Sequence, residues 1–215
     1  MSLKIEIIKT GALSVNSVII YNTDTLKCSV FDVGDFDPID NFITDNKLIP
    51  DVVIATHGHF DHLFGVSEFC KKYSCPFAMS SDDNYFINSP DFDVIKSRAE
   101  DLGYFNYIPP TKIDIDLKGK SKFNSMDLFW VPGHSPGSLC FYIKELKTLI
   151  SGDTLFYETI GRTDLIYGNY DLLVSEIESK LLALPDDTTV IPGHGYFTTI
   201  KHEKEFNPFL NKNPS

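Results

Sequence analysis

The chain has 215 residues, of which 42% are hydrophobic and 13% aromatic, and it carries a formal net charge of −11. These values are typical of a globular protein with a substantial core, and they exclude a disordered or fibrous chain. The acidic balance and the absence of a Lys or Arg cluster argue against a nucleic-acid surface, because phosphate groups are bound by basic faces.

The N-terminal half alternates short β-rich runs with turn signals. Residues 52–55 form a continuous apolar run, which is typical of a strand covered on both faces, and from Asp61 the apolar period changes to that of a helix. We therefore predict strands at 4–8, 17–21, 28–34 and 51–56, and helices at 38–46 and 61–73.

The second half repeats the interleaving of strands and helices, after a segment at 80–112 that is helical or irregular. Within that segment, 92–105 is a fair helix. Further along, we predict strands at 122–132, 138–145, 148–153 and 188–193, and helices at 170–184 and 200–206.

The apolar runs are all strand-sized, so none reaches the roughly 20 residues that a membrane helix needs. The start, MSLKIEIIKTG, lacks the apolar stretch and cleavage site of a secretory signal. We therefore expect a cytoplasmic protein with no membrane partner. The cysteines at 28, 70, 75 and 140 form no C-x-x-C pair, which indicates reduced thiols, with a Cys70–Cys75 disulfide as the alternative.

The stretch THGHFDHLFG at 56–65 holds three of the six histidines of the chain. With this composition, the pattern H-x-H-x-D-H arises by chance about once in two thousand such chains. The motif begins where the predicted buried strand 51–56 ends and the following helix starts. Such density at a strand end indicates a chemical role.

Three later apolar runs also stop at a His or an Asp, in the stretches FWVPGHSPGS, TLISGDT and VIPGHGY. If these strands lie side by side with their ends at one edge, the side chains that they deliver gather there. The residues delivered are His57, His59, Asp61, His62, His134, Asp153 and His194.

Five imidazoles and two carboxylates without a cysteine form the kind of ligand set that zinc, iron or manganese prefers. Seven ligands are too many for one tetrahedral ion, but they suffice for two ions with one bridging carboxylate and a bridging hydroxide. The set therefore predicts a hydrolytic centre with two divalent metals. Taken alone, His134 or His194 would more often be a loop histidine, and Asp153 a cap or turn residue; the joint placement favours function. We expect His202, in the polar stretch 200–206, to be a surface or packing histidine.

THGHFDH, PGHSPGS, SGDTLF and PGHG, in this order and spacing, resemble the metallo-β-lactamase superfamily over essentially the whole chain. The runs GDTLFYETIGRTDL and PGHGYFTTIKHEKEFNPFL look like its glyoxalase II (hydroxyacylglutathione hydrolase) branch in the short form. The resemblance implies an α/β fold, an αββα sandwich with the metal site at one edge of the two sheets. It also implies a single domain over residues 1–215, with no C-terminal helical glutathione-binding domain.

The same resemblance implies the role of each ligand. One metal would be held by His57, His59 and His134, and the other by Asp61, His62 and His194, with Asp153 as the bridge. Asp32, at the end of the strand 28–34, matches a family carboxylate that orients a ligand imidazole. Arg162 and Tyr196 stand where the family contacts the substrate carboxylate and the peptide portion of the thioester.

These inferences predict hydrolysis of a small thioester, S-D-lactoylglutathione, to D-lactate and glutathione, as in methylglyoxal detoxification. Asp61 would be catalytic, positioning the hydroxide and taking its proton. The metals would be zinc, with iron or manganese also compatible, and the chain a monomer or small homo-oligomer. The missing helical domain leaves weaker glutathione affinity or a different thioester open. β-Lactamase activity is disfavoured, because dizinc lactamases usually place a cysteine where this chain has Asp153.

Two other functions remain open on the sequence. The run G-R-T-D at 161–164 resembles persulfide dioxygenases, in which one iron held by His57, His134 and Asp153 would act on glutathione persulfide. The complete second set of ligands favours hydrolysis over this alternative. A non-catalytic metal-binding or partner-binding module would require a site closed to substrate.

Overall fold

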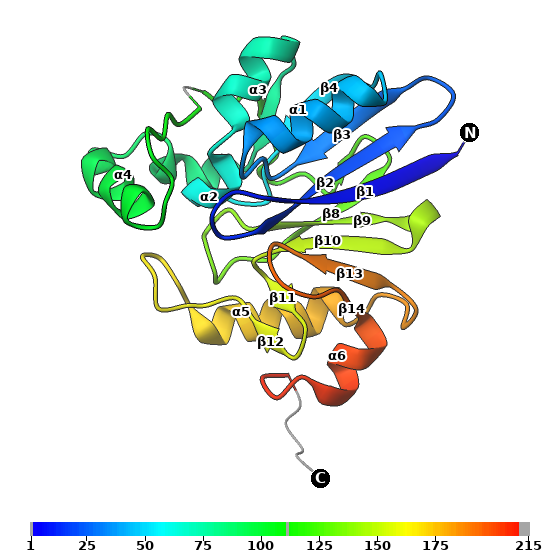
Figure 1. Ribbon diagram of the computed structural model, residues 1–215. Coiled ribbons are helices and arrows are strands. Elements are labelled where there is room, and N and C mark those ends of the chain that lie inside the picture. Colours follow the sequence, from blue (N-terminus) through cyan, green and yellow to red (C-terminus); the bar gives the residue numbers. More distant parts are fainter. Residues whose placement is uncertain (1, 111, 211–215) are drawn as a thin grey trace. The chain divides into compact units, whose positions relative to one another are not determined.

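The structure, a computed structural model, describes residues 2–110 and 112–210. The chain divides into two compact units, Met1–Leu117 and Lys118–Ser215, and each carries one large mixed sheet (Figure 1). The prediction of one domain over 1–215 is not tested by this division and stays a prediction.

The first unit is built on a sheet with the strand order β1-β2-β3-β4-β5-β6. β1 and β2 form a hairpin, β3 pairs antiparallel with β2, and the strands from β3 to β6 run parallel. Parallel neighbours need crossover connections, which α1 and α3 supply. The elements are β1 (Leu3–Thr10), β2 (Val15–Asn22), β3 (Lys27–Phe31), α1 (Phe36–Asp45), β4 (Ile49–Ile54), α2 (Phe60–Leu63), α3 (Val66–Tyr73), β5 (Phe77–Met79), a 3-10 turn (Ser81–Phe86), α4 (Phe92–Asp101) and β6 (Ile115–Asp116).

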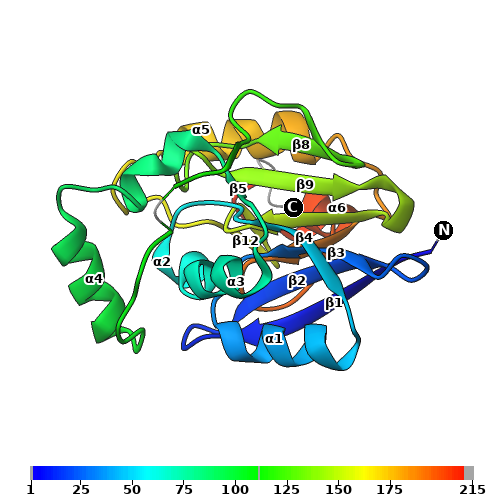
Figure 2. The ribbon, with the colours of Figure 1, turned by 90° about the horizontal axis from the view of Figure 1, so that it is seen from above.

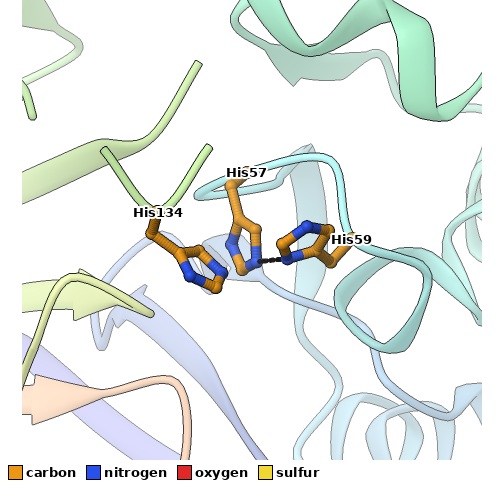
Figure 3. A group of neighbouring side chains, drawn as sticks. All are labelled: His57, His59 and His134. Carbon is orange, nitrogen blue, oxygen red and sulfur yellow. Dashed lines mark hydrogen bonds between the residues drawn. The ribbon is translucent and has the colours of Figure 1, made fainter. Parts of the chain in front are cut away.

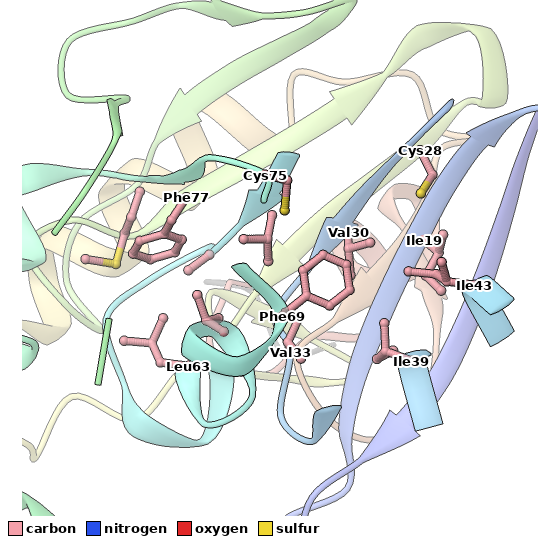
Figure 4. Packing of buried hydrophobic residues seen from close by; sticks show 14 of the residues in the cluster. Ile19, Cys28, Val30, Val33, Ile39, Ile43, Leu63, Phe69, Cys75 and Phe77 are labelled. Carbon is pink, nitrogen blue, oxygen red and sulfur yellow. The ribbon is translucent and has the colours of Figure 1, made fainter. Parts of the chain in front are cut away.

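The core of the first unit lies between this sheet and the helices α1 and α3 (Figures 2 and 4). Ile39 and Ile43 of α1 and Phe69 of α3 are buried against side chains of the sheet such as Ile19 and Val30. Burying large aliphatic and aromatic side chains of this kind contributes about 1.5–3 kcal/mol each. The packing fixes the end of β4, from which the histidine motif emerges.

The second unit has the strand order β14-β13-β10-β9-β8-β7, with a separate two-stranded ribbon of β11 and β12. α5 and the turn that follows it pack the buried Leu173 and Ile177 into the core of this unit. The elements are β7 (Lys122–Phe123), β8 (Met126–Trp130), β9 (Leu139–Ile143), a 3-10 turn (Lys144–Leu146), β10 (Thr148–Gly152), β11 (Leu155–Phe156), β12 (Thr159–Ile160), α5 (Tyr170–Glu176), a π-helical turn (Ile177–Leu181), β13 (Thr189–Pro192), β14 (Thr198–Thr199) and α6 (Ile200–Phe206).

Strand direction places three of the predicted side chains at one edge of this second sheet. β10 pairs parallel with β13, and β9 is antiparallel to both β8 and β10, so β8, β10 and β13 all run the same way. Their carboxyl ends therefore meet at the same edge. His134, Asp153 and His194 each follow one of these ends.

Three predicted elements differ from the structure. The helix expected at 61–73 is broken into α2 and α3, because a Cβ at Gly65 would lie 2.6 Å from Val33 and the chain must pass close to that residue. The strand expected at 122–132 is the hairpin β7–β8, which turns at Asn124 with a φ of 52°. The helix expected at 170–184 ends as an α-helix at Glu176 and continues as the π-helical turn.

The predictions about cysteines and membrane spans can be compared with the described residues. The four cysteines are unbridged thiols; Cys28, Cys75 and Cys140 are buried, and Cys70 is partly exposed. Burial raises the pKa of Cys28 and of Cys140 to about 12, which keeps both protonated. Within residues 2–110 and 112–210, no helix has the length and apolar character needed to cross a bilayer.

Candidate metal centre

The side chains predicted as metal ligands form two groups, one in each unit. In the first unit they come from the loop that follows β4 and from the first turn of α2. In the second unit they follow the ends of β8, β10 and β13. The first group comprises His57, His59, Asp61 and His62, and the second His134, Asp153 and His194.

The rings of His57 and His59 are in close contact. Nε2 of His57 and Nδ1 of His59 are 3.0 Å apart, and the two rings meet edge to face (Figure 3). Gly58 between them donates its N–H to Oδ2 of Asp83 at 2.8 Å, and its Cα is packed against Phe86, so a side chain at this position would clash. The ring of His59 also packs against Phe86, with centroids 4.8 Å apart.

Asp32 fixes the proton position on His57 through Thr56. It lies buried just beyond β3 with a φ of 53°, a left-handed conformation that aspartate tolerates. Its Oδ2 accepts from the hydroxyl of Thr56 at 2.8 Å and lies 3.0 Å from Nδ1 of His62, as an ion-pair contact. Because the hydroxyl hydrogen of Thr56 points to Asp32, its oxygen accepts from Nδ1 of His57 at 3.1 Å. The His57 imidazole therefore carries the proton on Nδ1 and presents a lone pair at Nε2.

The backbone fixes the proton on His134 in the same way. Nδ1 of His134 lies 2.8 Å from the carbonyl oxygen of Arg162 (Figure 3 shows the ring). A carbonyl only accepts, so Nδ1 holds the proton and Nε2 has the lone pair. The chain can pass this close because residue 161 is glycine: a Cβ there would lie 2.0 Å from the carbonyl oxygen of Asp153.

One carboxylate oxygen of Asp153 faces two imidazoles at once. Its Oδ2 lies 3.7 Å from Nε2 of His134 and 3.7 Å from Nε2 of His194. Asp153 follows Gly152, whose φ of 51° turns the chain at the end of β10, while Gly193 beside it donates to the Gly152 carbonyl at 2.8 Å. An oxygen placed between two ring nitrogens is in the position of a bridging ligand.

The spacing of these donor atoms fits a divalent metal. A tetrahedral ion with ligand distances of about 2.0–2.2 Å separates its ligand atoms by about 3.3–3.6 Å. Nε2 of His62 lies 3.6 Å from Oδ2 of Asp61, and the atoms of the two pairs at Asp153 are 3.7 Å apart, which is close to this range. Nε2 of His57 and Nδ1 of His59 are closer, at 3.0 Å, because they share a hydrogen bond. The lone pairs at Nε2 of His57 and His134 are those a cation requires, so the residues present fit such an ion.

The two residues predicted to bind substrate are both exposed. Tyr196 is 80% exposed in the loop after β13. Arg162 extends its side chain to Asp164, whose carboxylate accepts from Nε and Nη2 at 2.8 Å each. These hydrogen bonds raise the pKa of the Arg162 guanidinium, so it remains a cation. His202, expected as a surface or packing histidine, packs between Tyr157 and Phe206 on the second unit and bonds Glu158 through Nε2.

Sequence reasoning missed Thr56, Asp83 and Tyr107 beside the first group. Thr56 directly precedes His57, and a hydroxyl residue between a strand and a histidine could have been predicted to bond the imidazole. Asp83 lies 25 residues from the N–H that it accepts from, so only the folded chain joins them. Tyr107 packs on Phe60, the first residue of α2, and on Phe64, which follows the helix, with ring centroids 6.4 and 6.2 Å away.

Tyr107 is the basis of a stability prediction. Its side chain is 2% exposed, and its hydroxyl finds no hydrogen-bond partner among the described residues. Burial and the Asp61 carboxylate raise the pKa of Tyr107, so the hydroxyl stays neutral. Because an unsatisfied buried hydroxyl costs free energy, Tyr107→Phe is expected to raise the free energy of unfolding by about 1 kcal/mol in a urea titration.

Tyr104→Phe is the matched control for that prediction. Tyr104 is equally buried and packs on the same two phenylalanines, but its hydroxyl accepts from the Leu13 N–H at 3.0 Å. This variant is expected to lower the free energy of unfolding by about 1 kcal/mol. A loss of stability in both variants would show that the Tyr107 hydroxyl is bonded in solution.

Comparison with known proteins gives a consistent result. Residues 10–194 match the metallo-beta-lactamase superfamily. The chain is 32% identical over 217 residues to hydroxyacylglutathione hydrolase GloC of Haemophilus influenzae, covering 97% of this chain and 99% of that protein. The crystal structure of BLEG-1, a B3 metallo-beta-lactamase, superposes with a TM-score of 0.88 and 32% identity, covering 96% of this chain and 99% of the other.

TTHA1623, solved in a di-iron-bound form, gives a TM-score of 0.83 with 29% identity, covering 95% of this chain and all of the other. The predicted fold class is thus confirmed by the match to solved members of the family. The family match covers most of the chain, and the relative named a hydrolase covers nearly all of it. The chain therefore belongs to the metallo-beta-lactamase superfamily and is a metal-dependent hydrolase of that family.

Proposed function

We propose that the protein hydrolyses a small thioester, S-D-lactoylglutathione, to D-lactate and glutathione. The observation that carries the proposal is the ligand set, in which nitrogen and carboxylate donors stand close together and the protons of His57 and His134 are fixed on Nδ1. The similarity to GloC, a hydroxyacylglutathione hydrolase, supports the choice of substrate.

The proposed centre joins the two groups around two divalent ions. The pairing of donors within each unit, the bridging position of Asp153 and the di-iron form of TTHA1623 support two ions rather than one. Zinc is the proposed metal, with iron or manganese compatible with the same donors. One ion is assigned to His57, His59 and His134, the other to Asp61, His62 and His194, and Asp153 to both.

Each residue has a defined task in this mechanism. When bound, the two ions polarise the thioester carbonyl and acidify a shared water. Asp61, 7% exposed, orients the attacking water through its carboxylate and accepts the proton that the water loses. The sulfur departs as a thiolate without a dedicated acid, because the pKa of its parent thiol is only about 8.5, and it takes a proton from solvent afterwards. Arg162 binds a carboxylate of the thiol carrier, and Tyr196 lies along its peptide portion.

The proposal is tested by thiol release from S-D-lactoylglutathione with protein loaded with zinc, iron or manganese. We expect release of one thiol per lactate, about two metal ions per chain by elemental analysis, and loss of activity on chelation that metal restores. Two other substrates are run in parallel: glutathione persulfide with an oxygen electrode, and a chromogenic β-lactam, because BLEG-1 is a lactamase.

The outcomes separate three functions. Thiol release that far exceeds lactam opening and oxygen uptake supports the thioesterase. Oxygen uptake by protein with one iron per chain would replace it with the persulfide dioxygenase. Faster opening of the β-lactam would replace it with a lactamase, and metal-loaded protein that acts on none of the three would refute the proposal.

A further inference from the structure

The run G-R-T-D at 161–164 lies at the start of a loop, residues 161–169, that is anchored at both ends beside His134. At its start, the carbonyl oxygen of Arg162 lies 2.8 Å from Nδ1 of His134. At its end, the N–H of Asn169 donates to the carbonyl oxygen of Gly133 at 2.7 Å, and the Asn169 side chain caps α5. Both ends of the loop are therefore hydrogen-bonded to His134, a proposed metal ligand, or to its neighbour Gly133.

The shape of this loop is fixed by its own backbone. Gly168 donates its N–H to the carbonyl oxygen of Leu165 at 2.9 Å, and a Cβ at Gly168 would lie 2.1 Å from the carbonyl oxygen of Thr163. Ile166 and Tyr167 stand 52% and 53% exposed at its tip. The loop thus presents one cation, one carboxylate and two apolar side chains from a tight turn.

The cation and the carboxylate of the loop bind each other. Both oxygens of Asp164 accept from the guanidinium of Arg162, Oδ1 from Nε and Oδ2 from Nη2, each at 2.8 Å. This two-pronged geometry is the one in which arginine binds any carboxylate, including one on a substrate. The two side chains are 56% and 69% exposed, so water screens the pair and it opens readily.

We propose that Asp164 is a specificity-determining residue: its carboxylate occupies the Arg162 guanidinium at rest, and a carboxylate of the substrate must replace it. The proposal rests on the proposed function, in which Arg162 contacts the thiol carrier. Asp164 then weakens the binding of anionic thiol carriers and leaves neutral ones unaffected. A molecule whose carboxylate binds Arg162 less well than Asp164 does would therefore bind the protein only weakly.

The test is a binding titration that needs no turnover. The probes are S-methylglutathione, which has two carboxylates, and its diethyl ester, which has none; both are titrated calorimetrically into metal-loaded protein. The variants are Asp164→Asn and Arg162→Gln, with Asp171→Asn as the control, because Asp171 is an exposed aspartate in the first turn of α5 and its removal changes the net charge equally.

We expect Asp164→Asn to tighten binding of S-methylglutathione by roughly two- to six-fold, because this is the change in affinity that corresponds to the strength of an exposed ion pair. The gain should shrink at high salt and be absent for the diester. Arg162→Gln should weaken binding of the diacid and remove its advantage over the diester, while Asp171→Asn should match the wild type.

Three results would overturn the inference. Weaker binding of the diacid by Asp164→Asn would mean that Asp164 holds Arg162 in place for the substrate. Equal tightening by Asp171→Asn would mean a general charge effect, and wild-type binding that ignores the carboxylates would mean that Arg162 does not bind them. None of these depends on thiol release, so a failure of the proposed reaction is detected separately in its own assay.

Discussion

Asp61→Asn is expected to lower kcat for thiol release by about 10²- to 10⁴-fold, the range for loss of a positioned general base. Asn has the shape of Asp but cannot take the proton that the attacking water loses. Its amide nitrogen is also a donor where Oδ2 of Asp61 now faces Nε2 of His62 at 3.6 Å, and a donor cannot bind a cation. The variant should therefore also lose one of the two ions proposed to bind.

The measurement pairs steady-state thiol release with metal content per chain. Asp37→Asn is the matched control, because Asp37 is an exposed carboxylate in the first turn of α1 and its loss changes the net charge equally. That variant should keep its activity and its metal. If Asp61→Asn retained full kcat with two ions bound, Asp61 would be neither base nor ligand.

The strand ends could be predicted from the sequence because a covered strand leaves a visible pattern. The run at 52–55 is apolar at successive positions, and Val53 and Ile54 at the end of β4 and Ala55 just beyond it are all buried. Turn residues then mark where each such run stops, so the position of His57 just beyond the strand follows from the sequence. The edge shared by His134, Asp153 and His194 follows from strand direction, which the sequence implied only if the strands lay side by side.

The interactions that tune these side chains could not be predicted, because they join residues distant in sequence or depend on backbone detail. Asp32 reaches His57 only through the Thr56 hydroxyl, 24 residues further along. The break between α2 and α3 arises from the close approach of Gly65 to Val33, and helical periodicity does not report on such an approach. A sequence motif that specifies Arg162 does not indicate that its guanidinium is hydrogen-bonded to Asp164.

The second large effect is expected at Asp32, where substitution by Asn tests the assignment of the imidazole protons. The backbone N–H of Thr56 donates to Oδ1 at 2.8 Å, so the amide oxygen of the substituted side chain must take that position and its NH₂ group must replace Oδ2. The NH₂ group then donates to the Thr56 hydroxyl, which donates to Asp32 in the native chain.

This single change reverses the proton on His57. The displaced hydroxyl hydrogen of Thr56 turns toward Nδ1 of His57, which moves the imidazole proton to Nε2. An N–H at Nε2 cannot bind a cation, so we expect metal affinity to fall by about 10- to 100-fold, the usual cost of losing such a partner. Long-range ¹H–¹⁵N spectra of the histidine rings report the proton positions directly.

Asp32→Ala is the companion variant, and it separates orientation from stability. It leaves the N–H and the hydroxyl of Thr56 without their acceptor, removes the carboxylate 3.0 Å from Nδ1 of His62, and forces alanine into a φ of 53°. The expected loss of unfolding free energy is about 3–5 kcal/mol, whereas Asn, which tolerates this conformation and keeps the hydrogen bond to the Thr56 N–H, should lose about 1 kcal/mol. If the Asp32→Asn protein kept both its metal affinity and the proton on Nδ1 of His57, the Asp32 carboxylate would not be what selects the ligating nitrogen.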